Sequence, residues 1–193
     1  NFFTQGEITE KMDQYMPLND ALLRWGKTFA ALGIDYRGAT LRIDLIERDR
    51  KYPNGFMHGP VPAYFDWTGF HSAEINFTAT ASPGVLGAGD ISAKTLHHEG
   101  GHAAHFANNF MPSPIFGQEF APTSVAMAET QSMFLDSFLS DPVWISRYAR
   151  SSDGRQIPEA LLKESLIADQ KQLARELRWM LVIPFLERAL NMM

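Results

Sequence analysis

Apolar and polar positions along the chain follow two periods, one helical and one extended. Alternation over residues 40–47 and 73–81 predicts two strands, whereas proline or glycine at five positions within 51–64 predicts turns. Leucines spaced at helical intervals from Leu162 to Leu181 predict a long final helix, which Pro184 should kink. Helices are predicted over 7–33, 91–108, 123–140 and 158–193. The first range is divided into two helices at Pro17, and Asn19 is the predicted N-cap of the second. Asp90 is the predicted N-cap of the helix over 91–108. The pattern therefore predicts an α+β fold that is mainly α-helical.

The composition narrows the class of protein. The 193 residues include 22 acidic and 17 basic side chains, a formal net charge of −5, which argues against a nucleic-acid partner. No apolar run approaches the roughly 20 residues that span a bilayer, so we expect no membrane partner. The chain has no cysteine, which excludes disulfides and cysteine-ligated metals. Any metal must be bound by His, Asp or Glu.

The two ends of the sequence bear on its completeness and origin. The chain starts at Asn1 rather than at an initiator methionine, so we expect residues 1–193 to be one domain of a longer polypeptide, incomplete at both ends. The remainder of that polypeptide is then an expected partner. No signal peptide is recognisable, and we expect a cytoplasmic location, with a periplasmic or secreted origin left open.

The segment from His97 to His105 carries the candidate chemistry. It contains H-E-x-x-H, with His98 and His102 about 40° apart around a helix and one turn along it, so both rings can bind one ion. Glu99 lies at the edge of this stripe, where its carboxylate can reach a water on the ion. His105 lies roughly 10 Å further along than His98, so we expect it to support a ligand or face a substrate. His97 points about 100° away and is interpreted as a packed or solvated neighbour.

Gly100 and Gly101 lie inside this predicted helix. Each glycine costs about 1 kcal/mol relative to alanine at such a position. We therefore expect close approach by a neighbouring backbone, or by a substrate, over this turn.

Two histidines leave a catalytic zinc site one protein ligand short. The downstream carboxylates are Glu119, Glu129, Asp136 and Asp141. Glu129 is predicted amid apolar and small residues, where a carboxylate is costly unless it is paired with an arginine or bound to a metal. Asp136, seven residues later, shares that helix face and could orient a ligand histidine. Glu119 and Asp141 lie beside turns and are expected to be solvated, and a polar cluster of histidines without metal is the remaining alternative.

The motif resembles the H-E-x-G-H-x-x-H signature of the M3 family of zinc oligopeptidases. In that family a downstream glutamate is the third zinc ligand, in a helix reading E-x-P-S-Q-x-x-E, and Glu129 stands 27 residues after His102. The segment here lacks the proline and has Asp136 in place of the last glutamate. Asn76 and Phe77 are similar to the N-F strand that precedes the zinc helix in the family.

This resemblance implies a zincin-like catalytic domain with a small β-sheet beside the zinc-binding helix. It implies one Zn²⁺ per chain, bound by His98, His102 and Glu129, with Glu99 as the general base of a metalloendopeptidase that cleaves short peptides. His105, Asp136, Asn76 and Phe77 would then support the ligands or contact the substrate. If the strand at 74–80 is a sheet edge beside the zinc helix, it could pair with the substrate backbone.

Two other functions stay open at this point. The family's tyrosine- and histidine-rich region does not occur before Met193, which leaves a zincin-like module that binds zinc without turnover. A dipeptidyl carboxypeptidase of the angiotensin-converting type also uses H-E-x-x-H and a distant glutamate. His105 and the Asn76-Phe77 pair favour the M3 family over it.

Overall fold

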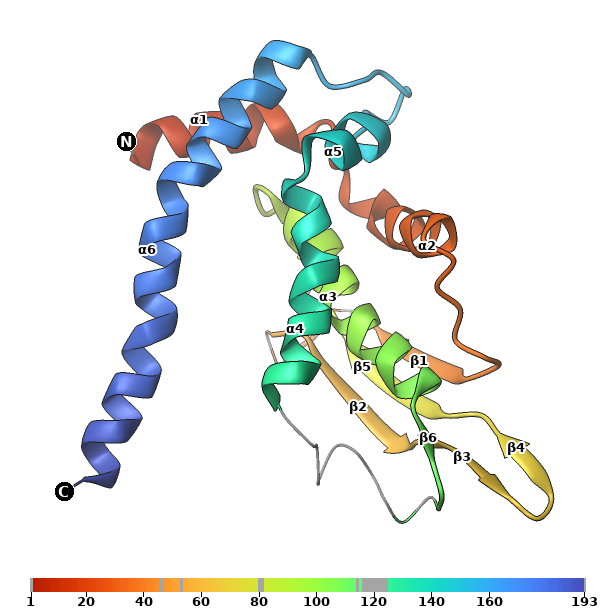
Figure 1. The fold of residues 1–193 in the computed structure, drawn as a ribbon. Coiled ribbons are helices and arrows are strands. Elements are labelled where there is room, and N and C mark those ends of the chain that lie inside the picture. Colours follow the sequence, from red (N-terminus) through yellow and green to blue (C-terminus); the bar gives the residue numbers. More distant parts are fainter. Residues whose placement is uncertain are drawn as a thin grey trace.

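A computed structural model describes residues 2–45, 47–52, 54–79, 82–113, 115 and 125–192. Its architecture is α+β and mainly helical, as predicted, with two small sheets on one side of the helices (Figure 1). The helices are α1 (Phe2–Asp13), α2 (Ala21–Ala31), α3 (Ala88–Asn108), α4 (Val125–Asp136), α5 (Pro142–Tyr148) and α6 (Glu159–Asn191), with 3-10 turns η1 (Leu18–Asp20) and η2 (Ser137–Ser140). The strands are β1 (Thr40–Asp44), β2 (Phe56–Val61), β3 (Ala63–Asp66), β4 (Gly69–His71), β5 (Glu74–Thr78) and β6 (Phe110–Met111).

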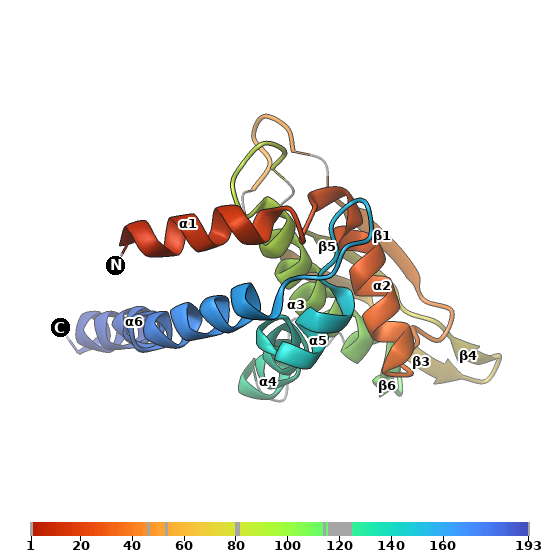
Figure 2. The same cartoon turned by 90° about the horizontal axis from the view of Figure 1, so that it is seen from above.

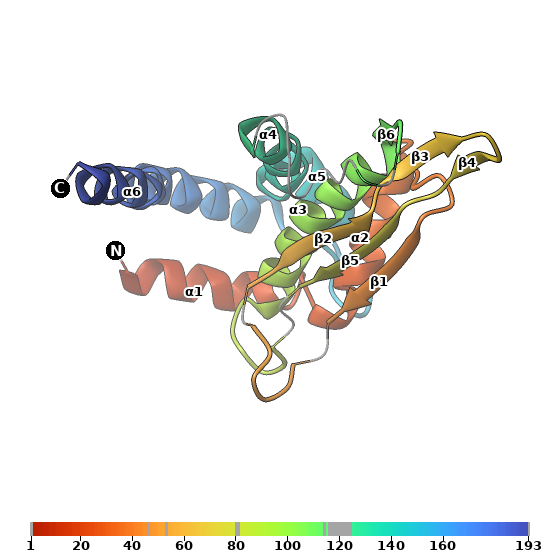
Figure 3. The same cartoon turned by 90° about the horizontal axis from the view of Figure 1, so that it is seen from below.

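The sheet beside α3 has the order β1-β5-β2, and the second sheet has the order β4-β3-β6. β5 is parallel to β1 and antiparallel to β2, so β5 is central and β2 is an edge strand on the side of α4 (Figure 3). The prediction of turns throughout 51–64 was wrong, because β2 and β3 lie there. Pro60 is tolerated because it falls where the β2–β5 register shifts, between His58 and Val61, in an edge strand.

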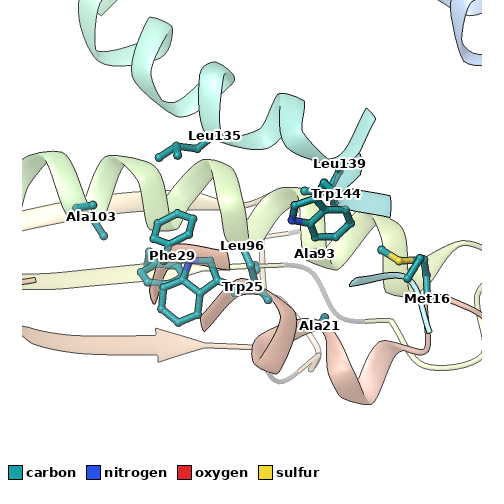
Figure 4. Packing of buried hydrophobic residues seen from close by; sticks show 14 of the residues in the cluster. Met16, Ala21, Trp25, Phe29, Ala93, Leu96, Ala103, Leu135, Leu139 and Trp144 are labelled. Atoms are coloured by element: carbon teal, nitrogen blue, oxygen red, sulfur yellow. The ribbon is translucent and has the colours of Figure 1, made fainter. Parts of the chain in front are cut away.

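Helix α3 forms the centre of the core. Leu135 of α4 and Leu139 of η2 pack on one side of it, and Trp25 and Phe29 of α2 pack on the other (Figure 4). Alanines on α3 are almost fully buried, which lets these neighbours approach closely. The turn that carries the H-E-x-x-H motif is therefore held between α2 and α4.

Several helix ends differ from the prediction. α3 begins at Ala88 after Gly87, whose φ of 78° is a left-handed conformation that glycine adopts readily, so Asp90 lies in the first turn rather than at the cap. α2 begins at Ala21, because the predicted cap Asn19 is part of η1. Asp141, expected to be solvated, caps the unpredicted helix α5 by accepting hydrogen bonds from two backbone N–H groups.

Helix α6 continues through Pro184 as one helix, and its second half extends away from the rest of the described chain (Figures 1 and 2). Large apolar side chains on this half are exposed, including Trp179 at 69% and Phe185 at 63%. In the part of the chain that the structure describes, no helix has the length and apolar character needed to cross a bilayer.

Candidate metal centre

His98 and His102 lie one turn apart on α3 and face the same side. Their ring centroids are 4.9 Å apart and their planes are nearly perpendicular, at 84°. Burial lowers the pKa of His102, which favours the neutral ring that a metal requires. The helix thus presents two imidazoles to one point, as the spacing predicted.

Glu129 reaches this point from α4. Its Oε2 atom is 3.3 Å from His98 Nε2 and 3.6 Å from His102 Nε2. Ligand atoms around a tetrahedral ion with bonds of about 2.0–2.1 Å are roughly 3.3 Å apart, so these separations suit a single zinc-sized ion. Within the described residues, these three are the group whose ligand atoms approach closely enough to hold a metal ion. Glu119 lies outside the described residues, and Asp141 is engaged at α5.

Two further side chains fix the orientation of these potential ligands. His98 Nδ1 donates a hydrogen bond to Asp136 Oδ2 at 2.9 Å, so in the neutral ring Nε2, which is turned toward Glu129, carries no hydrogen. This bond is the largest cause of the raised pKa of His98. Ser132 donates to Glu129 Oε2 at 3.2 Å. The sequence indicated Asp136 through its spacing from Glu129 but gave no signal for Ser132.

The two glycines of the motif allow α2 and α4 to approach α3, as expected. A Cβ atom on Gly100 would lie 2.3 Å from Nε1 of the Trp25 indole. A Cβ atom on Gly101 would lie 2.9 Å from Leu135 Cδ1 and 3.3 Å from the Ser132 backbone. Gly101 therefore sets the close α3–α4 distance that brings Glu129 to the histidines.

Glu99 is only 7% exposed and follows His98 on α3. Burial raises the pKa of its carboxyl group to about 7; the nearby His98 opposes this shift and Glu129 adds to it. A carboxylate with a pKa near neutrality can take up and release a proton at neutral pH. Its position beside the two histidines suits proton transfer rather than metal binding.

The other two histidines of the segment lie apart from this group. His97 is fully buried, and its Nδ1 donates to the Ala93 carbonyl oxygen at 2.7 Å, in agreement with a packed neighbour. His105 is half-buried, burial lowers its pKa, and its buried Nδ1 has no hydrogen-bond partner among the described residues. Its predicted role toward a ligand or a substrate stays a prediction.

The prediction for Phe77 needs correction, whereas the one for Asn76 stays a prediction. Phe77 is 1% exposed and its ring packs 5.8 Å from that of Trp25, so it supports the core behind α3 instead of contacting a substrate. Successive side chains of a strand alternate, which directs Asn76 to the opposite face of the sheet, away from α2. The condition for pairing with a substrate, that this strand be a sheet edge, is not met, because β5 is paired on both sides.

Comparison with known proteins adds an independent observation. Residues 35–190 match the family model described as peptidase family M3. The matched region includes every residue of the cluster and most of the described helices and strands. It corresponds to the resemblance that the motif indicated and favours that family over the angiotensin-converting type. No curated protein matches the chain.

Proposed function

The chain belongs to peptidase family M3 and so to a metallopeptidase family, and from that premise we propose that it is a zinc metallopeptidase that hydrolyses peptide bonds in short peptides. The observation that carries the proposal is the position of Glu129 Oε2, 3.3 Å and 3.6 Å from the Nε2 atoms of His98 and His102. A carboxylate from a second helix completes a two-histidine site with the donor set of a catalytic zinc.

His98, His102 and Glu129 would hold the ion. When bound, zinc lowers the pKa of a coordinated water and polarises the carbonyl group that is attacked. Glu99 would accept the proton of the attacking water and donate it to the departing amine, a role that suits a carboxyl group whose pKa is about 7. Asp136 would keep His98 in the tautomer and orientation that ligation needs.

We further propose that an extended substrate pairs with β2 rather than with β5. β2 is an edge strand of its sheet and lies on the side of α4, which carries Glu129 (Figure 3). An edge strand offers free backbone N–H and C=O groups to an incoming peptide. This pairing recognises the peptide backbone, as an enzyme acting on varied short peptides requires.

The test is turnover of a short internally quenched peptide, measured alongside zinc content. We expect the wild-type chain to bind one zinc ion and to cleave the peptide. Glu99→Gln should lower kcat by about 10²–10⁴-fold, the usual contribution of a general base, while it keeps the zinc. Glu164→Gln, an exposed carboxylate on α6, is the matched control and should retain both properties. If the wild-type chain binds zinc but does not cleave the peptide, it is a metal-binding module and the proposed peptidase activity is wrong. If it binds no stoichiometric zinc, the proposed metal centre is wrong.

A further inference from the structure

Gly55, immediately before β2, lies against the proposed general base. A Cβ atom on Gly55 would be 3.0 Å from Glu99 Oε1, 3.1 Å from Glu99 Cγ and 2.3 Å from Thr95 Cγ2. Gly55 is not among the glycines with positive φ, so its backbone does not itself demand glycine. What excludes a side chain is the space already occupied by Thr95 and Glu99.

Packing against neighbouring atoms limits the position of the Glu99 side chain. The Glu99 residue is 7% exposed, and its Oε1 and Cγ atoms lie directly opposite the Gly55 backbone. Glutamate has three rotatable side-chain bonds, so its position depends in part on the atoms that surround it. Gly55 supplies one of these surrounding surfaces.

We propose that Gly55 is a positioning residue: its bare backbone limits where the Glu99 carboxylate can lie and keeps it beside the histidine pair. The inference rests on the proposed function, because it assigns Glu99 the proton transfer. It also connects the base with the proposed substrate strand, since Gly55 leads directly into β2. A side chain at position 55 would displace the carboxylate by a few tenths of an ångström or more.

Gly59, which lies within β2, offers a comparison in which kcat and KM should respond differently. A Cβ atom there would lie 2.2 Å from Phe106 Cδ1, a clash as close as the one at Gly55, but the atom it meets belongs to the core and not to the base. Gly55→Ala and Gly59→Ala should therefore both strain the contact between β2 and α3. Only Gly55→Ala should move Glu99.

We expect Gly55→Ala to lower kcat by about tenfold or more, because small misplacements of a reacting group have large effects. Its zinc affinity should stay near that of the wild type, whereas Gly59→Ala, a change within the proposed substrate strand, should act mainly on KM. Equal losses of kcat in the two variants would overturn the proposal, because strain on β2 would then explain both.

A second pair of variants separates Glu99 from Thr95. Thr95→Ser removes the methyl group at 2.3 Å and keeps the hydroxyl that bonds to the Ile91 carbonyl oxygen. In Gly55→Ala/Thr95→Ser we expect thermal stability to recover while kcat stays low. Full recovery of kcat would assign the loss to Thr95 and contradict the role given to Gly55.

Cobalt substitution gives a readout that does not need turnover. The visible absorption of bound Co²⁺ responds to ionisation of its water, which a neighbouring carboxylate influences. The pH dependence of that absorption should shift in Gly55→Ala and not in Gly59→Ala. No shift in Gly55→Ala would contradict the proposal, even if the wild-type protein bound metal without cleaving peptides.

Discussion

His97 and His98 are consecutive in the sequence, yet they lie in two different regions of the molecule. His97 faces the apolar side of α3, where its ring packs edge-on against Phe29 at 5.7 Å and Trp144 at 5.6 Å. His98 faces α4, where it bonds to Asp136 and approaches Glu129. Burial lowers the pKa of His97 to about 4, whereas the bond to Asp136 raises that of His98.

The difference shows that the chemistry of this helix comes from what packs against it. The 100° rotation between neighbouring helical residues separates a core histidine from a potential ligand. α2 covers one side with aromatic rings (Figure 4), and α4 brings the carboxylates of Glu129 and Asp136 to the other. The contrast predicts that variants on the α4 side change metal binding, while variants on the α2 side change stability.

The largest expected effect is that of Glu129→Ala. Metal affinity should fall by roughly a thousandfold, because binding free energies of about 10–16 kcal/mol at zinc sites are shared among a few ligands. The stability of the metal-free protein should change little, since the Glu129 side chain is 45% exposed. Competition with a chromophoric chelator measures the affinity, with Thr130→Ala on the same helix as the control. Unchanged affinity in Glu129→Ala would exclude it as a ligand.

The next largest effect is a dependence of stability on pH that arises from His97. Its pKa is about 4 in the folded chain and 6.5 ordinarily, so the unfolded state binds more protons between these values. The free energy of unfolding should therefore fall as the pH falls from about 6.5 to about 4, by up to about 3 kcal/mol. Above pH 6.5 this contribution is fully present.

Denaturant titrations of the metal-free protein across this pH range measure the effect. His97→Phe should show a shallower loss of stability toward acid than the wild type, while its zinc affinity stays near normal. Thr130→Ala, a change at an exposed position on α4 that removes no titratable group, should keep the wild-type slope. Parallel pH curves for the wild type and His97→Phe would contradict the assignment of this effect to His97.

A smaller effect is expected for Asp136→Asn. Removing a carboxylate that orients a ligand histidine costs about 10–100-fold in metal affinity. The asparagine side chain can still accept a hydrogen bond but lacks the charge. The same chelator competition measures the change, with Asp49→Asn as an exposed control. An affinity equal to that of the wild type would show that His98 does not need this partner.

Much of the cluster could be predicted from the sequence, because the spacing of residues within α3 and within α4 determines which side chains share a helix face. The spacing of His98 and His102 fixes their shared face, and the seven residues from Glu129 to Asp136 do the same on α4. The glycine pair also carried a signal, since two glycines inside a helix indicate close neighbours. These inferences need only helical geometry, whereas the choice of Glu129 as the third ligand rested on its predicted apolar surroundings and on the family resemblance.

The remaining features depend on contacts between distant segments. The central position of β5 and the edge position of β2 are set by pairing among segments more than ten residues apart. Gly55 gave no signal because its significance lies in the Glu99 atoms opposite it. Phe77 was misassigned because a motif resemblance specifies a position in the chain and not the side to which the side chain points.

The most direct test of the metal centre is anomalous diffraction at the zinc edge from crystals of the zinc-loaded chain. The account predicts one strong peak at about 2.0–2.2 Å from Nε2 of His98, Nε2 of His102 and a carboxylate oxygen of Glu129. A peak bound elsewhere, or a zinc on the two histidines with Glu129 turned away, would contradict it.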